Sequence, residues 1–401
     1  MGGESQKTLK TMVDRFESTY TNIHVELVGM GNYDALSQKL MGAVAAKNPP
    51  VIAQMYENWT AQLHAGGELV FMDSFVRGPD GLGAEDLADI YPALLENNSW
   101  EGRLLTLPFN KSVPVYYYNV PMFAAAGYPE FPKTWPDFRA AANKLTKRDA
   151  AGNVEVWGAA GGTDIWIFGS MLFQRGSRFV GPQPKSEVRS QGAEGRSADE
   201  DGPPEFNSPE GVAALQFQVD MVLKDKVQNT DVGRTPMDDF QVGRMATLTG
   251  SSTWRAPVVD KETFPVGMAP IPTWDRQAAI VYGTNIGMFR RATEMQKAAA
   301  WKFIKWFTGP EQQVEWSLGT WYVPIHRRSL EDPRMAKRLA ETPGLKAAYA
   351  QMDCAVFEPR GLKWLAGRKA LVEELEQAML GAKTPKRALD DAAARYERGS
   401  Q

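Results

Sequence analysis

The sequence predicts an α/β fold of two lobes, with a mostly parallel sheet in each lobe. First, the chain has 401 residues, which is too long for one ordinary hydrophobic core. Second, its first third alternates between helix and strand patterns, the order from which parallel sheets are built. Third, residues 105–119, LTLPFNKSVPVYYYN, are typical of a crossing from one lobe to the other.

That crossing is predicted from two prolines. Pro108 and Pro114 bracket five residues that are poor candidates for a helix, because proline lacks an N–H and forces the preceding residue toward extended geometry. An apolar, aromatic strand follows at 115–118, and we expect the polar residues 110–112 to be exposed at the junction. The alternative is an ordinary loop-to-strand junction.

The remaining helices and strands are predicted from the spacing of apolar residues and from the residues that end helices. Residues 5–19 carry apolar side chains at the spacing of one helix face, and 23–27 alternate with the period of a strand. Asn48-Pro49-Pro50 ends a helix at 33–46 before a buried strand at 51–56. Further helices are expected at 135–145, 209–223, 295–307, 311–318 and 371–379, a strand at 154–158, and a strand pair at 266–271 and 279–289. Residues 182–205 are polar and rich in Gly and Pro, which predicts a surface excursion.

Composition excludes several classes of protein. The net charge of -3 gives no electrostatic case for binding nucleic acid, so we expect no nucleic-acid partner. No apolar run reaches the 18 residues of a membrane span. The single cysteine, Cys354, has no second cysteine with which to form an intramolecular disulfide or a thiol metal site.

The motifs of common enzymes are missing from the sequence. It contains no GxxxxGK[ST], no HExxH, and no GxSxG at a strand-to-helix turn. Its three histidines, His24, His64 and His326, are widely separated, which makes a metal cluster or a histidine-based triad a weak hypothesis. We therefore expect no catalytic residue, no metal and no cofactor.

Many short segments, spread in order along nearly the whole chain, resemble one protein family. These segments are GNYDALSQKL (31–40), PPVIAQMYE (49–57), LPFNKSVPVYYYN (107–119), YPEFPKTWPDF (128–138), FNSPEGVAAL (206–215), TLTGSST (247–253), VYGTNIGMF (281–289), GPE (309–311), WYVPI (321–325) and EELEQAMLGAKTPKRALD (373–390). By these segments the chain is similar to the extracellular solute-binding proteins of ABC importers, of the maltose-binding structural class, and most similar to the periplasmic glycerol-3-phosphate-binding proteins.

The resemblance implies a two-lobed periplasmic-binding-protein fold with the ligand cleft at the hinge. Lobe 1 would comprise 1–110 and 257–309, and lobe 2 would comprise 111–256 and 310–401. The protein would be a monomeric, periplasmic or extracellular receptor that delivers a small molecule to the membrane permease subunits of an ABC importer. Two features depart from the family pattern: its opening strand with an aromatic-His-Ser segment is missing before Gly2, and the polar excursion at 182–205 is longer than the family leads us to expect. The charged-then-apolar segment of a signal peptide is also not seen before Gly2.

The resemblance also assigns binding residues, each at the position that matches the family pattern. One carboxylate and one tyrosine would bind glycerol hydroxyls, because a carboxylate accepts two hydroxyl donors; these are Glu57 and Tyr33. A second set would surround the phosphate, anchored by a guanidinium that can hold two phosphate oxygens; it comprises Ser112, Ser251, Ser252, Gly283, Tyr322 and Arg368. Trp166 would form an aromatic wall. Each of these side chains also has a structural alternative, as a core aromatic, a helix cap or a solvated helix face.

These residues predict a receptor for sn-glycerol 3-phosphate or for glycerophosphodiesters such as glycerophosphocholine. The first alternative is a receptor for an oligosaccharide or disaccharide on the same fold, because the chain has 12 tryptophans that could stack on sugar rings. The second alternative, from another class, is a hydrolase on a two-lobed scaffold, which would turn its ligand over.

Overall fold

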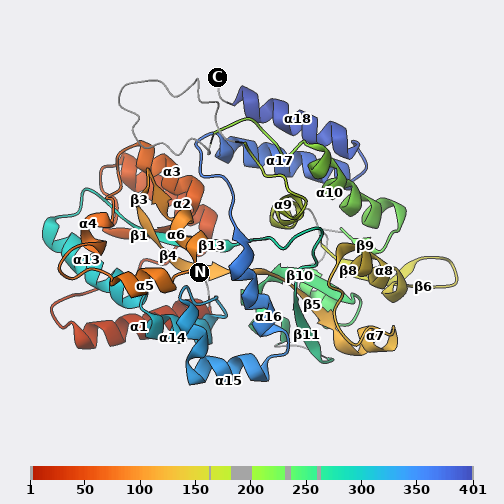
Figure 1. Cartoon of the computed structure of the whole chain (residues 1–401), viewed down its shortest axis with the longest axis horizontal. Coiled ribbons are helices and arrows are strands. Elements are labelled where there is room, and N and C mark those ends of the chain that lie inside the picture. The colour runs from red at the N-terminus through yellow and green to blue at the C-terminus, as the bar shows by residue number, and fades with distance from the viewer. Residues whose placement is uncertain (1–2, 162–163, 182–200, 231–235, 260–262, 400–401) are drawn as a thin grey trace. The chain divides into compact units, whose positions relative to one another are not determined.

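The computed structural model describes residues 3–161, 164–181, 201–230, 236–259 and 263–399 (Figure 1). These residues form two compact units, each made of segments that are distant in the sequence. Unit 1 contains 3–112 and 283–340, and unit 2 contains 113–181, 201–282 and 341–399 within the described ranges. The expected excursion at 182–205 lies mostly outside the described residues.

Unit 1 is a small sheet with helices packed around it. The sheet has the strand order β1-β13-β4. The elements of unit 1 are α1 (Glu4–Thr19), α2 (Tyr33–Ala45), β1 (Ile52–Met55), α3 (Glu57–Ala65), α4 (Asp73–Val76), α5 (Ala84–Asp89), α6 (Pro92–Asn97), β2 (Ser99–Trp100), β3 (Arg103–Leu104), β4 (Thr106–Ser112), β13 (Tyr282–Met288), α13 (Glu294–Phe307), α14 (Pro310–Thr320), the 3-10 helix η4 (Arg327–Glu331) and α15 (Pro333–Glu341).

The core of unit 1 forms where the amphipathic helices cover the sheet. Helix α1 buries the apolar face that its spacing predicts, which confirms that helix. Phe16 on this face meets Phe303 of α13 edge-on, with ring centroids 5.2 Å apart. Phe109 of β4 stacks on Phe307 of α13 at 4.7 Å. Aromatic packing therefore holds β4 in place at Phe109, and the polar residues 110–112 follow directly in the same strand.

Unit 2 is built around strand β5, which continues from the crossing. Its elements are β5 (Pro114–Asn119), α7 (Val120–Ala125), α8 (Trp135–Leu145), β6 (Lys147–Arg148), β7 (Val154–Val156), β8 (Ala159–Ala160), α9 (Ile165–Gln174), α10 (Pro209–Val219), the π-helix η2 (Asp220–Lys224), β9 (Gln228–Asn229), α11 (Pro236–Gln241), β10 (Thr247–Ser251), η3 (Ser252–Trp254), α12 (Arg255–Val259), β11 (Val266–Pro270), β12 (Ala279–Ile280), α16 (Leu345–Tyr349), η5 (Ala350–Cys354), β14 (Ala355–Val356), α17 (Trp364–Met379) and α18 (Pro385–Arg398).

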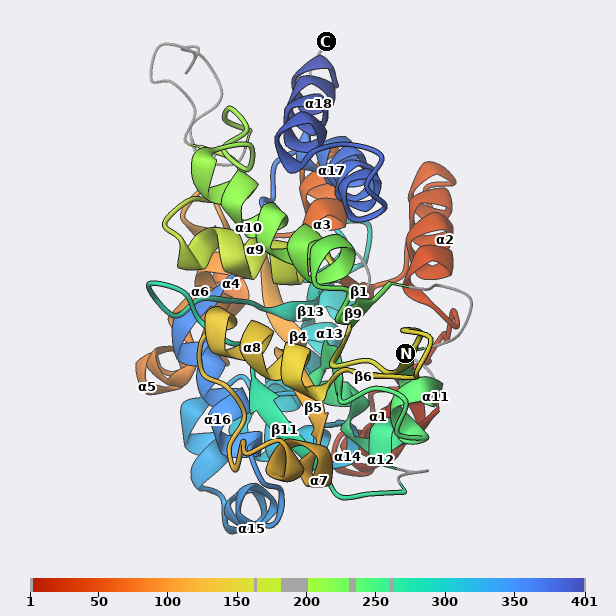
Figure 2. The ribbon, with the colours of Figure 1, turned by 90° about the vertical axis from the view of Figure 1, so that its right-hand side faces the viewer.

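Helices α9, α10, α17 and α18 share one core with the aromatic face of β5. Figure 1 shows α17 and α18 running side by side, and Figure 2 shows α10 beside α9. Phe179 packs against Trp364 of α17 with ring centroids 4.8 Å apart. This packing fixes α9 and α17, the two helices that carry Trp166 and Arg368.

Three strand pairs of the two main sheets are antiparallel, whereas mostly parallel sheets were expected. Strand β5 pairs antiparallel with both β10 and β11, and β1 pairs antiparallel with β13. The alternation of helix and strand predicted parallel neighbours in sequence order, but each of these pairs joins segments that are far apart in the chain. For the same reason β11 does not pair with the 279–289 segment, since its partner is β5. The expected strand at 23–27 belongs to no sheet among the residues that the structure describes.

The two units also divide the chain differently from the expected lobes. Residues 257–282 fall in unit 2 because β11 pairs with β5, and residues 310–340 fall in unit 1 because α14 packs on α1. Within the described ranges, no helix is both long and apolar enough to cross a membrane.

Candidate functional site

The crossing residues form the polar end of β4 in unit 1, and they are buried. Asn110, Lys111 and Ser112 are each at most 3% exposed, so the expectation that they are exposed at the junction is wrong. The strand continues through both prolines as an extended segment, as predicted, but side chains from α2, α3, α6 and β13 cover it. Buried polar side chains need partners, and unit 1 provides them for Asn110 and Lys111.

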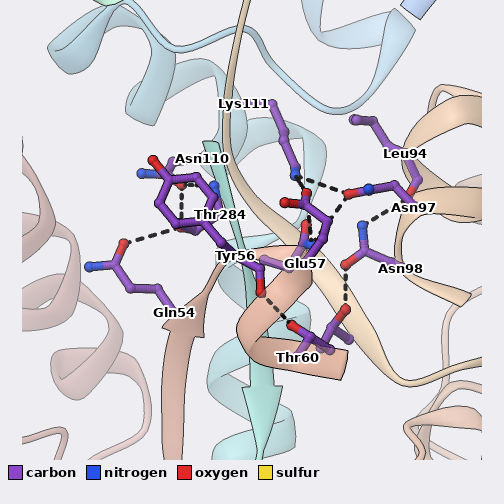
Figure 3. A network of polar contacts seen from close by, with 12 residues as sticks. Gln54, Tyr56, Glu57, Thr60, Leu94, Asn97, Asn98, Asn110, Lys111 and Thr284 are labelled. Carbon is purple, nitrogen blue, oxygen red and sulfur yellow. Dashed lines mark hydrogen bonds and ion pairs between the residues drawn. The ribbon is translucent and has the colours of Figure 1, made fainter. Parts of the chain in front are cut away.

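Two tyrosines named from the sequence meet at Asn110. The amide of Asn110 donates to the hydroxyl of Tyr33 at 3.2 Å. Asn110 Oδ1 accepts the backbone N–H of Thr284 at 2.8 Å, and Figure 3 shows these last two residues side by side. Tyr322 also faces this group: burial raises its pKa well above the ordinary value, and the neighbouring Tyr33 adds to the rise. The structure thus brings Tyr33 and Tyr322 together around a residue that was not among the expected binding residues.

Glu57 forms a buried network with Lys111 and two asparagines (Figure 3). The ammonium of Lys111 lies 3.4 Å from Glu57 Oε1 and 3.3 Å from Asn97 Oδ1. The side-chain amide of Asn285 donates to the same two oxygens, at 3.4 Å and 3.3 Å respectively. Burial lowers the pKa of the Lys111 ammonium, while the charge of Glu57 opposes that shift.

Gly283 is required by backbone packing in unit 1. Its φ is +110°, and a Cβ placed there would lie 1.7 Å from the carbonyl oxygen of Asn110. Only glycine tolerates both conditions. The packing of β4 therefore accounts for the glycine, and the contact of the Gly283 backbone with a ligand phosphate stays a prediction.

In unit 2, Arg368 and Trp166 contact each other. The guanidinium carbon of Arg368, on α17, lies 5.2 Å from the ring centroid of Trp166, on α9. Its Nε–H donates to Glu358 Oε2 at 2.8 Å. The ring of Tyr282 also packs against Trp166, with the two ring centroids 4.6 Å apart. Arg368 is thus held by a carboxylate and an aromatic ring at once.

Asp164 caps helix α9 beside these residues. Its Oδ1 accepts the backbone N–H groups of Trp166 at 2.8 Å and Ile167 at 3.2 Å. Burial raises the pKa of the Asp164 carboxyl above its ordinary value, and these two backbone donors and the charge of Arg368 oppose the rise. A buried, capped carboxylate near a guanidinium is an arrangement that sequence reasoning missed.

A cavity of about 690 Å³ in unit 2 is lined by this group. Trp135, Trp166 and Trp254 contribute aromatic surface, while Thr249, Gln228, Asp164 and Arg368 contribute polar groups. Its size is in the range of small-molecule sites, which typically hold about 300–1,000 Å³. Of the residues predicted from the sequence to bind ligand, Trp166 and Arg368 line this cavity.

The two serines at the end of β10 have backbone and capping roles. The Ser251 hydroxyl accepts the N–H of Thr253 at 3.2 Å, and the Ser252 N–H donates to the carbonyl of Val113 at 2.9 Å. Tyr117 donates its hydroxyl to the carbonyl of Ser251 at 2.8 Å. Ser252 is fully buried and Ser251 is partly exposed, and neither lines the cavity.

Among the residues that the structure describes, no group of three or more His, Cys, Asp or Glu side chains could hold a metal ion. The buried His326 instead joins structural elements of unit 1, with Nδ1 2.9 Å from Asp89 Oδ2 and Nε2 2.9 Å from the Thr308 carbonyl oxygen.

Comparison with known proteins places this geometry in context. Residues 11–346 match the family described as bacterial extracellular solute-binding protein. The sn-glycerol-3-phosphate-binding periplasmic protein UgpB of Yersinia pseudotuberculosis is 31% identical, over 98% of this chain and 89% of that protein. UgpB of Escherichia coli is 29% identical, over 100% of this chain and 90% of that protein.

Solved structures with the same fold bind different ligands. UgpB from Mycobacterium tuberculosis in complex with glycerophosphocholine superposes with a TM-score of 0.81 at 20% identity, covering 99% of this chain and 96% of that one. An ABC substrate-binding protein from Listeria monocytogenes in complex with cycloalternan has a TM-score of 0.82 at 21% identity, covering 98% and 96%. At these identities the likeness establishes the two-lobed fold.

Proposed function

Because the chain belongs to the bacterial extracellular solute-binding proteins, a family of non-enzymatic receptors of ABC transporters, we propose that it captures sn-glycerol 3-phosphate or a glycerophosphodiester for import. Under this proposal Arg368, with Trp166 beside it, contacts the phosphate, while Glu57 and Tyr33 contact the glycerol hydroxyls. Ser112, Ser251, Ser252, Gly283 and Tyr322 stay in the proposed binding set.

The observation that carries the proposal is the guanidinium of Arg368 at the wall of the unit 2 cavity. A guanidinium has five N–H donors in a planar fork and keeps its charge at physiological pH. Glu358 accepts the Nε–H and Trp166 lies against one side, which sets the orientation of the fork. A receptor for a neutral ligand has no need of a charged group at this place, whereas a phosphate does.

The relatives support the same ligand class. Those with UgpB names are described as binding sn-glycerol 3-phosphate, and the solved UgpB holds glycerophosphocholine. The proposed partners are the permease subunits of an ABC importer, which receive the ligand from a monomeric receptor. The proposed location is the periplasm or the cell exterior, in keeping with the family.

A sugar receptor is the second candidate, and one observation favours it. Three tryptophans line the unit 2 cavity, and aromatic rings are the usual partners of sugar faces. Solved neighbours of the same fold hold sugars, among them cycloalternan and maltose. This candidate leaves Arg368 without a ligand charge to bind.

Replacing Arg368 separates the two candidates. We expect Arg368→Ala to weaken binding of glycerol 3-phosphate by at least about a hundredfold, because the buried phosphate would lose a charge-assisted contact. A neutral sugar would change little. Arg387→Ala, which removes an exposed guanidinium of α18 that pairs with Asp391, is the matched control. Isothermal titration of both variants decides the question, and an undiminished affinity of Arg368→Ala for the phosphate ligand would refute the proposal.

A further inference from the structure

Lys111 is a buried cation whose presence needs a reason. Its side chain is 1% exposed, and its ammonium faces Glu57 and Asn97. Burying an ammonium costs several kcal/mol after relaxation, and an apolar side chain in place of a buried pair is often as stable or more so. Stability alone therefore does not account for a lysine at the end of β4.

The carboxylate of Glu57 is engaged on one side only. Oε1 receives both Lys111 and Asn285, while Oε2 accepts no hydrogen bond from the residues that the structure describes. Glu57 is also the first residue of α3, a nine-residue helix whose N-terminal dipole favours a negative charge. Its side chain is 16% exposed, so one oxygen is fixed while the group remains partly accessible.

Asn97 and Asn285 are ordered around the ammonium at a cost. Both are buried, and Asn97 Nδ2 and Asn285 Oδ1 have no hydrogen-bond partner among the described residues. A flipped Asn97 would turn its NH₂ group toward the ammonium, which is repulsive. The lysine charge thus dictates an amide orientation that leaves buried polar atoms unsatisfied, an arrangement that lowers the stability of the protein.

We propose that Lys111 is a positioning residue for ligand recognition: with Asn97 and Asn285 it holds the Glu57 carboxylate in one orientation, so that this end of the ligand must offer hydroxyl donors and is rejected if it carries a carboxylate. The inference rests on the proposed function in one respect, namely that Glu57 contacts the ligand.

This role makes a specificity prediction for the unmodified protein. Glycerol 3-phosphate and 3-phosphoglycerate share the phosphate and differ at the far end, which is a hydroxyl in one and a carboxylate in the other. The Glu57 carboxylate is expected to reject the second compound, since two carboxylates brought together repel each other and neither can donate a hydrogen bond. We expect an affinity at least about a hundredfold lower for 3-phosphoglycerate, within the range by which hydrogen-bonding sites discriminate.

A double-mutant cycle tests whether Lys111 acts through Glu57. Lys111→Met should weaken glycerol 3-phosphate binding by about ten- to a hundredfold. The ratio of the affinity for glycerol 3-phosphate to the affinity for 3-phosphoglycerate should fall by at least about tenfold. In the Glu57→Gln background the same Lys111→Met change should alter affinity by less than about threefold, because the group that it positions has lost its charge. Lys305→Met, which breaks the more exposed pair with Asp80 in unit 1, should leave both ligands unchanged.

The wild type, Lys111→Met, Glu57→Gln and the double variant are also unfolded by heat without ligand, and their melting temperatures are compared. Glu57→Gln alone leaves a buried ammonium without its counterion, so the double variant should lose less melting temperature than the sum of the two single losses. This readout does not depend on which ligand the protein binds. If the wild type binds maltose and neither phosphate compound, the proposed ligand fails, and the affinity cycle is run with maltose.

Two results would overturn the inference. One is a Lys111→Met loss of affinity that is equal in both backgrounds together with additive melting shifts, since lysine would then act without Glu57. The other is a wild type that binds glycerol 3-phosphate and 3-phosphoglycerate equally well, which needs no variant to observe.

Discussion

The Nε–H of Arg368 donates to Oε2 of Glu358 at 2.8 Å. The same oxygen accepts the indole N–H of Trp364 at 2.7 Å, so the carboxylate is held between two donors of α17. Glu358 thereby orients the guanidinium and also places a negative charge close to any anion that Arg368 binds. These two effects oppose each other in phosphate binding.

Glu358→Gln separates the orienting effect from the charge effect, because glutamine keeps an acceptor oxygen at a similar position and removes the negative charge. We expect phosphate ligands to bind about tenfold more tightly, since removing a like charge several ångströms from the phosphate gains on the order of 1–2 kcal/mol at an effective dielectric of about 20. Calorimetric titration at low and high salt measures the gain, which should shrink as salt rises. Glu373→Gln, which removes a carboxylate of α17 paired with Arg395, is the control, and weaker binding by Glu358→Gln would show that orientation dominates.

Trp166 is expected to set the breadth of the ligand class. Trp166→Leu should weaken glycerophosphocholine by about tenfold, since an aromatic face attracts a quaternary ammonium by about 1–2 kcal/mol. Glycerol 3-phosphate, which has no such group, should lose less than about threefold, although Arg368 lies against the same ring. Parallel titrations of the two compounds test this, and equal losses for both would mean that Trp166 acts only by supporting Arg368.

Asp164 provides a prediction about stability and pH. Its folded-state pKa is raised by burial, so its contribution to stability is full below the unfolded pKa and is lost as pH rises through the folded pKa. Asp164→Asn keeps an N-cap acceptor and removes the buried charge. We therefore expect the variant to melt higher than the wild type at pH 7, with a difference that narrows as the pH falls toward 4.

Asp149→Asn is the opposite control for this pH series. Hydrogen bonds from Asn153 lower the pKa of Asp149, so its contribution is present above the unfolded pKa and is lost as pH falls. This variant should melt lower than the wild type at pH 7. Thermal melts from pH 4 to 7 compare the two, and an Asp164→Asn protein that is less stable at neutral pH would contradict the account.

Local patterns predicted the helices well. The apolar spacing of 9, 12, 13 and 16 marks the buried face of α1, and Pro209 after Ser208 marks the first turn of α10. Such signals lie within a few residues of one another, so single-sequence reasoning can use them. The segment at 23–27 shows the limit: its alternation is typical of a strand, yet the structure gives it no strand partner.

Sheet direction and the polar partners depend on distant contacts. Nothing within residues 114–119 indicates that β10 and β11 lie on either side of β5 with antiparallel register. Lys111 was expected to be exposed because lysine usually is, and its burial becomes visible only when Glu57, 54 positions earlier, faces it. Asn97 and Asn285 carry no local signal at all, since an isolated asparagine is most often a turn or surface residue.

Arg368 and Trp166 were named from the resemblance, and the structure places them in contact on one cavity of unit 2. Glu358 and Asp164, which set the charge around that guanidinium, were not named. The family pattern identifies residues proposed to touch the ligand. The side chains that orient those residues are found only from interatomic distances in the structure. Which residues contact the ligand remains a prediction.

Calorimetric titration of the wild-type protein with glycerol 3-phosphate, glycerophosphocholine, maltose and trehalose tests the central claim most directly. The account predicts saturable binding of glycerol 3-phosphate and of glycerophosphocholine, with no heat change from either neutral disaccharide at millimolar concentration. Saturable binding of maltose or trehalose, with no response to either phosphate compound, would contradict it.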